Sequence, residues 1–224
     1  MPFYYLVDDA IVSLNGGPRF GRLSTLNPLA QGATLPPAES GRIICWSGWC
    51  GDSIFALDFR TWTPAVWKKL DDFVFALPEG ASRGADSTSP DDQILRLCLR
   101  PHPRHMLADP QSCLSFLRRY ATRPVELLLD PAGFLTRSML PRAHEHLLRA
   151  MDSLADHPQV SAVIIANVAP APDDDDLLQP APVNRGLLPA ALIRDFASRF
   201  PIDKPLILLG DGPAAQVRFL DAGG

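Results

Sequence analysis

The sequence has 224 residues, which is long enough to bury one sizeable core, so we expect a single domain overall. Its 46% hydrophobic and 21% charged residues are ordinary for a globular protein, and its formal net charge of −4 provides no long-range attraction for nucleic acid. The longest apolar runs fall short of the roughly 18 residues that a membrane-spanning helix needs, and no basic region precedes an apolar segment at the N-terminus. These features favour a cytoplasmic protein without nucleic-acid or membrane partners.

The four cysteines are Cys45, Cys50, Cys98 and Cys113, and they lack the paired spacing of a zinc site. Four residues separate Cys45 from Cys50, and no second close pair exists. Cys98 lies inside an apolar run, where a free cysteine behaves as a small hydrophobic residue. We therefore expect four unlinked thiols in a reducing compartment.

Residues 1–41 have no sustained periodicity, and we expect an N-terminal arm or irregular segment there, followed by a barrel-like domain over residues 42–224. Residues 3–14 are compatible with a strand or one arm of a hairpin, and Asn15-Gly16-Gly17-Pro18 is a strong turn signal. Residues 19–41 are rich in proline and glycine. A loop of that length is uncommon in a compact domain, so it is either an arm packed on the body or a functional loop.

Short strands are predicted at Arg42–Trp46, at residues 54–59 and at residues 73–77. Thr63-Pro64 predicts the start of a helix between the last two, with Thr63 as the N-cap and Pro64 in the first turn. Residues 79–92 are predicted to form a polar loop.

From residue 94 onward, apolar runs of strand type alternate with segments of helical period. Strands are predicted at 94–100, Val125–Leu129, Val160–Ile165 and 206–209, and helices after Asp109-Pro110, at 138–154, at 187–200 and at 214–220. Runs without polar alternation are typical of strands covered on both faces, as in parallel sheets. The βαβ cadence predicts an α/β fold, and its spacing fits both a barrel and an open doubly wound sheet. Counting the earlier strand candidates, we expect a TIM-like (β/α) barrel, shortened or irregular in the N-terminal half.

Five segments in this half resemble the sugar phosphate isomerase/epimerase family, the xylose-isomerase-like TIM barrels, in the order and spacing of their elements. They are Leu97-Cys98-Leu99-Arg100-Pro101-His102, Leu127-Leu128-Leu129-Asp130-Pro131, Val163-Ile164-Ile165-Ala166-Asn167-Val168, Pro182-Val183-Asn184-Arg185-Gly186-Leu187-Leu188 and Pro205-Leu206-Ile207-Leu208-Leu209-Gly210-Asp211. The resemblance covers a little over half of the chain. It implies a barrel acting on a small sugar or sugar phosphate, with the site at the carboxyl ends of the strands.

The resemblance also implies a divalent metal held by Glu, Asp, His and Glu from successive strand ends, where it would polarise substrate oxygens. Asp130 is the only clean match to this ligand set. Arg100 stands at the first Glu position, Ala166 or Asn167 at the His, and Gly210 or Asp211 at the last Glu. Because a guanidinium adds a positive charge that cannot be lost, we expect no metal site with the family's ligands, and the cofactor stays unknown.

Arg100, His102 and His105 cluster after the strand at 94–100. They fit an anion or sugar-phosphate pocket, since arginine makes bidentate contacts to phosphate. The alternative is a buried ion pair between Arg100 and Asp130, with the two histidines as polar loop residues. We expect Arg100 to lie near Asp130 under either interpretation.

Asp130 is a candidate metal ligand or general base, or a side chain that caps its own turn. With His102 it is the candidate acid/base pair, whereas Arg100, His105, Asn167 and Asp211 are candidate ligand-binding residues. Two functions remain open. One is a sugar phosphate isomerase/epimerase-like enzyme, and the other is a non-catalytic barrel relative with a decayed metal site that binds a ligand or a protein partner.

Two further groups have a structural and a functional interpretation. The four tryptophans could line a sugar pocket by stacking or could pack in the core or under the arm; they are Trp46, Trp49, Trp62 and Trp67. The run Asp173-Asp174-Asp175-Asp176 could attract a cation, but such runs are usually solvated.

Overall fold

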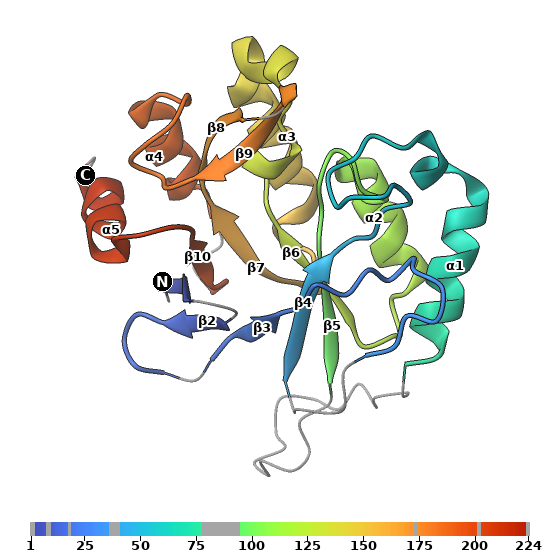
Figure 1. Ribbon diagram of the computed structural model, residues 1–224. Coiled ribbons are helices and arrows are strands. Elements are labelled where there is room, and N and C mark those ends of the chain that lie inside the picture. The colour runs from blue at the N-terminus through green and yellow to red at the C-terminus, as the bar shows by residue number, and fades with distance from the viewer. Residues whose placement is uncertain are drawn as a thin grey trace.

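Eight strands close into a barrel in the computed structural model, which describes residues 3–7, 10–17, 19–35, 41–77, 95–172, 174–200 and 203–222 (Figure 1). The strand order around the barrel is β1-β10-β7-β6-β5-β4-β3-β2. The strands are β1 (Phe3–Val7), β2 (Ala10–Ser13), β3 (Gly21–Leu23), β4 (Arg42–Trp46), β5 (Arg96–Arg100), β6 (Val125–Leu129), β7 (Val160–Ile165) and β10 (Leu206–Leu208). The TIM-like barrel predicted from the sequence is confirmed.

The irregularity lies in the N-terminal half, as predicted. β2 runs antiparallel to both β1 and β3, whereas the remaining pairs around the barrel, including β1 with β10, are parallel. Tight connections therefore replace helices among the first three strands. Residues 3–23 contribute three barrel strands, so the barrel begins inside the segment that we expected to be an arm. The sequence hides this because β3 is only three residues long and pairs with β2 through just two residues.

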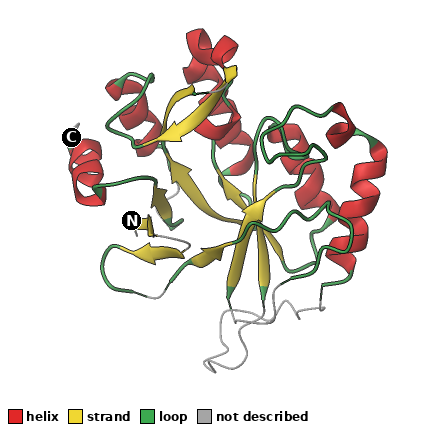
Figure 2. Ribbon diagram, viewed as in Figure 1, coloured by secondary structure: helices red, strands yellow, loops and turns green. Residues whose placement is uncertain are grey.

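In the described ranges, five α-helices lie outside the barrel (Figure 2). They are α1 (Pro64–Phe75), α2 (Pro110–Arg119), α3 (Ala143–Leu154), α4 (Ala190–Ser198) and α5 (Pro213–Asp221). Each of α2, α3 and α4 contacts the next helix in the chain. Asp109 caps α2 by accepting the Ser112 N–H at 2.7 Å, as the Asp-Pro signal predicted. Short 3-10 helices are also present, at Phe59–Trp62, Ala132–Phe134 and Arg137–Arg142.

Two predicted strands are wrong. Residues 54–59 form a turn that leads into the 3-10 helix Phe59–Trp62, and Leu57 and Phe59 are exposed instead of covered by a sheet. Residues 73–77 belong mainly to the end of α1, because Phe73 and Val74 continue the buried helical face that begins at Val66.

Two predicted helices begin later than expected. The helix predicted at 138–154 starts with a 3-10 turn because Pro141 interrupts the α-helical hydrogen bonds. The helix predicted at 187–200 starts after Pro189. The polar loop predicted at 79–92 lies outside the described residues.

Even-numbered residues of β4, β5 and β6 face the barrel interior, since side chains alternate along a strand. At the amino ends of these strands, Glu126 accepts hydrogen bonds from Arg42 Nε at 2.6 Å and Arg96 Nη1 at 2.7 Å. The same alternation brings Trp46, Arg100 and Asp130 together at the carboxyl ends. The apolar residues between them, Cys98 and Leu128 among others, fill the middle of the barrel.

A second, two-stranded sheet stands outside the barrel and was not predicted. β8 (Asn167–Ala171) and β9 (Asp174–Ala181) form an antiparallel hairpin after β7, above the carboxyl ends of the strands (Figure 1). Prolines and a run of acidic residues mask its strand character in the sequence.

All four cysteines are free thiols, as expected. Among the described helices, none combines the length and apolarity needed to cross a membrane.

Candidate functional site

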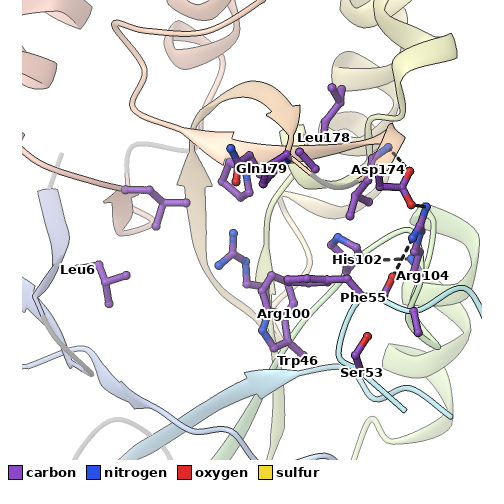
Figure 3. A pocket seen from close by; sticks show the side chains of 16 residues that line it. Leu6, Trp46, Ser53, Phe55, Arg100, His102, Arg104, Asp174, Leu178 and Gln179 are labelled. Atoms are coloured by element: carbon purple, nitrogen blue, oxygen red, sulfur yellow. Dashed lines mark hydrogen bonds and ion pairs between the residues drawn. The ribbon is translucent and has the colours of Figure 1, made fainter. Parts of the chain in front are cut away.

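A cavity of about 700 Å³ opens at the carboxyl ends of the barrel strands, between the barrel and the β8–β9 hairpin (Figure 3). Its walls come from β4, β5, the loops that follow them, the hairpin and the ends of β1 and β10. The lining residues are Leu6, Trp46, Ser53, Phe55, Ala56, Arg100, His102, Arg104, Ala171, Pro172, Asp174, Leu177, Leu178, Gln179, Pro180 and Leu209. Volume and position are those of a small-molecule site in a barrel.

Arg100 is the central polar residue of this cavity. Its Nη2 and Nε donate to the same carboxylate oxygen of Asp130, at 2.6 Å and 3.1 Å, and its guanidinium carbon lies 4.4 Å from the centre of the Trp46 ring. The Arg100 side chain is 12% exposed and that of Asp130 is 1% exposed. The expected proximity of Arg100 to Asp130 is therefore confirmed, and the pair is a buried one.

Asp130 is also tied to its own turn. Its second carboxylate oxygen accepts the Gly133 backbone N–H at 3.0 Å. A side chain at Gly133 would lie 2.8 Å from this carboxylate, so the close turn needs glycine. The turn-capping interpretation and the ion-pair interpretation of Asp130 both hold in the structure, and together they occupy both oxygens. Metal or base roles for Asp130 remain predictions.

His102 and His105 lie in the loop after β5, where the alternative interpretation placed them, but they are buried in an aromatic cluster. The His102 ring centre is 4.7 Å from that of Phe55 and 5.4 Å from that of Trp46. Trp49 stacks on His105 with ring centres 5.5 Å apart. Burial lowers the pKa of His102 to about 2 and that of His105 to about 4, so both rings are neutral at neutral pH.

Hydrogen bonds determine which nitrogen carries the proton in each neutral ring. His102 Nδ1 accepts the Arg104 backbone N–H at 3.2 Å, which assigns the proton to Nε2. His105 Nε2 donates to the Ile54 carbonyl at 2.6 Å, and its Nδ1 is buried without a hydrogen-bond partner in the described part of the chain. Only His102 lines the cavity, so His105 supports the wall behind it.

Arg104 connects the hairpin to the rest of the site. Its Nη2 lies 2.5 Å from Asp174 Oδ2, and its Nη1 donates to the Phe55 carbonyl at 2.8 Å (Figure 3). This ion pair and the hydrogen bonds that Asp174 accepts from Asp176 and Leu177 lower the pKa of the Asp174 carboxyl. Within the acidic run, Asp174 is thus a pairing residue, whereas the sequence favoured a solvated run. Asp173 lies outside the described residues.

Asn167 and Asp211 do not line this cavity. The buried Asn167 amide accepts the backbone N–H groups of Val168 and Leu188, each at 2.8 Å, and donates to the Leu188 carbonyl at 3.0 Å. These hydrogen bonds connect the start of β8 to the loop before α4. Gly186 lies against this amide with φ +135°, a backbone conformation that only glycine adopts readily. Asp211 is exposed after β10. Ligand binding by either residue remains a prediction.

Of the four tryptophans, Trp46 alone lines the cavity. Trp49 covers His105, Trp62 donates from Nε1 to the His105 carbonyl at 2.9 Å, and Trp67 lies beside Arg119. Trp67 packs against the core, as the structural interpretation expects, whereas Trp62 is 38% exposed. Sequence reasoning missed the cavity contributions of Phe55 and of the hairpin leucines Leu177 and Leu178, because residues 54–59 were assigned to a strand and residues 177–178 to no element.

No protein-family model and no curated protein matches the chain by sequence. Three solved structures are similar, each at 12% identity: the probable 3-DHS dehydratase from Bacillus anthracis involved in petrobactin synthesis, a xylose isomerase domain protein from Planctomyces limnophilus, and a xylose isomerase-like TIM barrel protein from Mycobacterium smegmatis in complex with magnesium. Their TM-scores are 0.45, 0.42 and 0.39, and the matches cover 80%, 80% and 85% of this chain. The chain spans 61%, 55% and 60% of the matched chains. The barrel assignment rests on this chain's own closed strand order.

Proposed function

We propose that this chain is a barrel protein that binds a small organic molecule in the cavity under the β8–β9 hairpin, with an ion pair in place of the metal site that the family resemblance implies. One observation supports this most directly: Arg100 occupies the cavity floor and holds Asp130, the one residue that matches the metal ligands of the family it resembles. A cavity with an arginine at its base and apolar walls has the features of a small-molecule binding site.

The residues present do not fit the divalent metal that the resemblance implies. Both Asp130 oxygens already accept hydrogen bonds, and the guanidinium that holds one of them repels a cation. Asn167 uses its amide to bind backbone groups, and Ala166 offers no donor atom. In the described ranges, no group of three or more histidine, cysteine or acidic side chains is arranged to hold a metal ion.

A sugar phosphate isomerase or epimerase is the second candidate, favoured by the placement of Asp130 and His102 at the carboxyl ends of neighbouring strands. In that function Asp130 and His102 would carry the acid/base work. The neutral His102 ring would have to accept a proton at a nitrogen whose pKa is held at about 2, so we rank this candidate below ligand binding.

The test measures ligand-induced thermal stabilisation against a panel of sugars, sugar phosphates, carboxylates and nucleosides, since a ligand that binds only the folded state raises its apparent stability. Ala171 lines the cavity, and Ala171→Trp fills it; Ala214→Trp, on the exposed face of α5, is the matched control. We expect at least one compound to stabilise the wild type and Ala214→Trp but not Ala171→Trp.

Three results would argue against the proposal. If no compound stabilises the protein in a way that depends on the cavity, binding there is refuted. Conversion of a sugar phosphate into its isomer or epimer, followed by nuclear magnetic resonance, would favour the second candidate. A stoichiometric divalent ion found by elemental analysis would show that the site still holds metal.

A further inference from the structure

The barrel side of the cavity offers two nitrogen donors, from Arg100 and His102, beside the hydroxyl of Ser53. Arg100 uses Nε and Nη2 to bind Asp130, and its Nη1 has no partner among the described residues. In Figure 3 the Arg100 side chain rises from the end of β5 toward the hairpin. His102 adds a second donor, because the Arg104 N–H bonded to Nδ1 places the proton on Nε2. Arg100 and His102 thus offer two donors on the same wall of the cavity. Such a pair favours a ligand with hydrogen-bond acceptors, such as a carboxylate.

The charges around this wall are nearly balanced, which limits the charge of the ligand. Arg100 is paired with Asp130, and Arg104 is paired with Asp174. Both histidines are neutral, so they add no positive charge. A phosphate monoester would bring close to two negative charges into a site whose two arginines are already paired with carboxylates. The free energy lost when the phosphate leaves water would therefore not be recovered from contacts in the site. A single carboxylate charge, shared between a guanidinium and a neutral donor, fits better.

The hairpin side of the cavity is mainly apolar; its two polar residues, Asp174 and Gln179, bind Arg104 and the Pro170 carbonyl. Ala171, Pro172, Leu177, Leu178 and Pro180 line it, and Leu209 extends it toward the barrel. Leu177, Leu178 and Leu209 are each less than 10% exposed. Hydroxyl groups of a sugar would face these side chains without hydrogen-bond partners, which disfavours their burial. An aromatic or branched aliphatic body would instead bury apolar surface against them.

We infer that the cavity takes a small monocarboxylate with an apolar body, its carboxylate on Arg100 and His102 and its body against the hairpin leucines. This inference rests on the proposed ligand-binding function and replaces the sugar phosphate expected from the family resemblance with a different chemical class. It follows from the donors on one wall, the balanced charges and the mainly apolar opposite wall.

The test compares four probes by isothermal titration calorimetry on the full chain: phenylacetate, phenylacetamide, glucose 6-phosphate and inorganic phosphate. Phenylacetamide keeps the size and the apolar body of phenylacetate but lacks its charge. We expect phenylacetate to bind about tenfold or more tightly than each of the other three, because hydrogen bonds to charged groups contribute that much or more.

The variant that tests the carboxylate contact replaces both members of the ion pair, Arg100→Met together with Asp130→Asn. The asparagine side chain carries no charge, and its carbonyl oxygen can still accept the Gly133 N–H, so no buried charge is left unpaired. We expect this double variant to keep its fold by circular dichroism and to bind phenylacetate about 10- to 100-fold more weakly. Arg119→Gln, which breaks the Arg119–Asp71 ion pair between α2 and α1, is the control and should leave phenylacetate binding unchanged.

Three results would overturn the inference. The first is that glucose 6-phosphate or inorganic phosphate binds as tightly as phenylacetate or more tightly. The second is that phenylacetamide binds as tightly as phenylacetate. The third is that the folded double variant binds phenylacetate as tightly as the wild type does. Sugar-phosphate binding that Ala171→Trp abolishes would refute the monocarboxylate and leave the proposed binding function standing. Absence of any cavity-dependent binding, in this experiment and in the panel, would refute both.

Discussion

The Arg100 guanidinium donates two hydrogen bonds to one carboxylate oxygen of Asp130, at 2.6 Å and 3.1 Å, from the end of the neighbouring strand. The Trp46 ring covers this guanidinium, and the Asp130 side chain is almost fully buried. A buried carboxylate that loses its partner is strongly unfavourable, whereas removal of both charges together is often tolerated.

We therefore expect Arg100→Ala to lower the free energy of unfolding by roughly 3–5 kcal/mol. The double variant Arg100→Met with Asp130→Asn should lose much less, because no charge remains unpaired. Urea denaturation followed by circular dichroism measures both. A loss of less than about 1 kcal/mol for Arg100→Ala would show that solvent reaches Asp130 and that the pair contributes like a surface ion pair.

Introducing by Arg100→Glu the glutamate that the resemblance implies at this position should not create a metal site. The change places a second carboxylate near Asp130 and removes the repelling guanidinium, but the positions of the third and fourth ligands still carry Ala166 or Asn167 and Gly210 or Asp211. We expect the melting temperature of Arg100→Glu to fall through like-charge repulsion and to change little when manganese is added. Wild-type protein with and without manganese is the control. A large manganese-dependent rise in the variant would contradict this expectation.

Stability should fall as the pH drops below about 6.5. Burial lowers the pKa of His102 to about 2 and that of His105 to about 4, both from 6.5, so the unfolded chain binds more protons than the folded one between pH 6.5 and about 4. The stability from both neutral rings is fully present above pH 6.5. It decreases by up to about 1.4 kcal/mol per histidine for each pH unit through this window. Below pH 4 only His102 continues to contribute.

Urea denaturation at several pH values tests this dependence. In His105→Gln, whose amide can still donate to the Ile54 carbonyl, the slope between pH 6 and 4.5 should be clearly smaller than that of the wild type. It should not vanish, because His102 and His157, whose pKa burial also lowers, still contribute. Between pH 7 and 8 the two proteins should have the same slope, which serves as the internal control. An unchanged slope in the acidic range would mean that His105 is protonated as easily in the folded protein as in the unfolded one.

The Arg104–Asp174 ion pair should keep the hairpin over the cavity. Asp174→Asn removes the charge but keeps a carbonyl oxygen for the backbone N–H groups of Asp176 and Leu177, so the turn survives while the link to Arg104 weakens. We expect amide hydrogen exchange in residues 174–181 to accelerate by roughly two- to fivefold, since partly exposed ion pairs contribute little. Exchange in β6 should not change. Lys68→Gln, which breaks an exposed ion pair on α1, is the matched control.

Much of the barrel was predictable because its parallel strands are buried on both faces. Val125–Leu129 and Val160–Ile165 are apolar runs interrupted only by Glu126 and Ser161, and α3 between them carries a stripe of helical period. Such patterns follow from burial alone. The errors occurred where an apolar run is short or ambiguous: residues 73–77 continue a helix, and residues 54–59 line a cavity from a loop. The hairpin escaped prediction because proline and aspartate are rare in strands.

Local pattern and period were enough to predict the order of βαβ units, the free thiols and the polar residues at the carboxyl ends of the strands. What these polar residues do depends on contacts that form only in the folded barrel. The Arg100–Asp130 pair is 30 residues apart in the chain, and the Arg104–Asp174 pair is 70 residues apart. Their energies depend on distance, on burial and on competing partners, which exist only once the barrel has closed. For the same reason the sequence could not show that the Asn167 amide binds backbone groups, or that the loop residues His102 and His105 are buried and neutral.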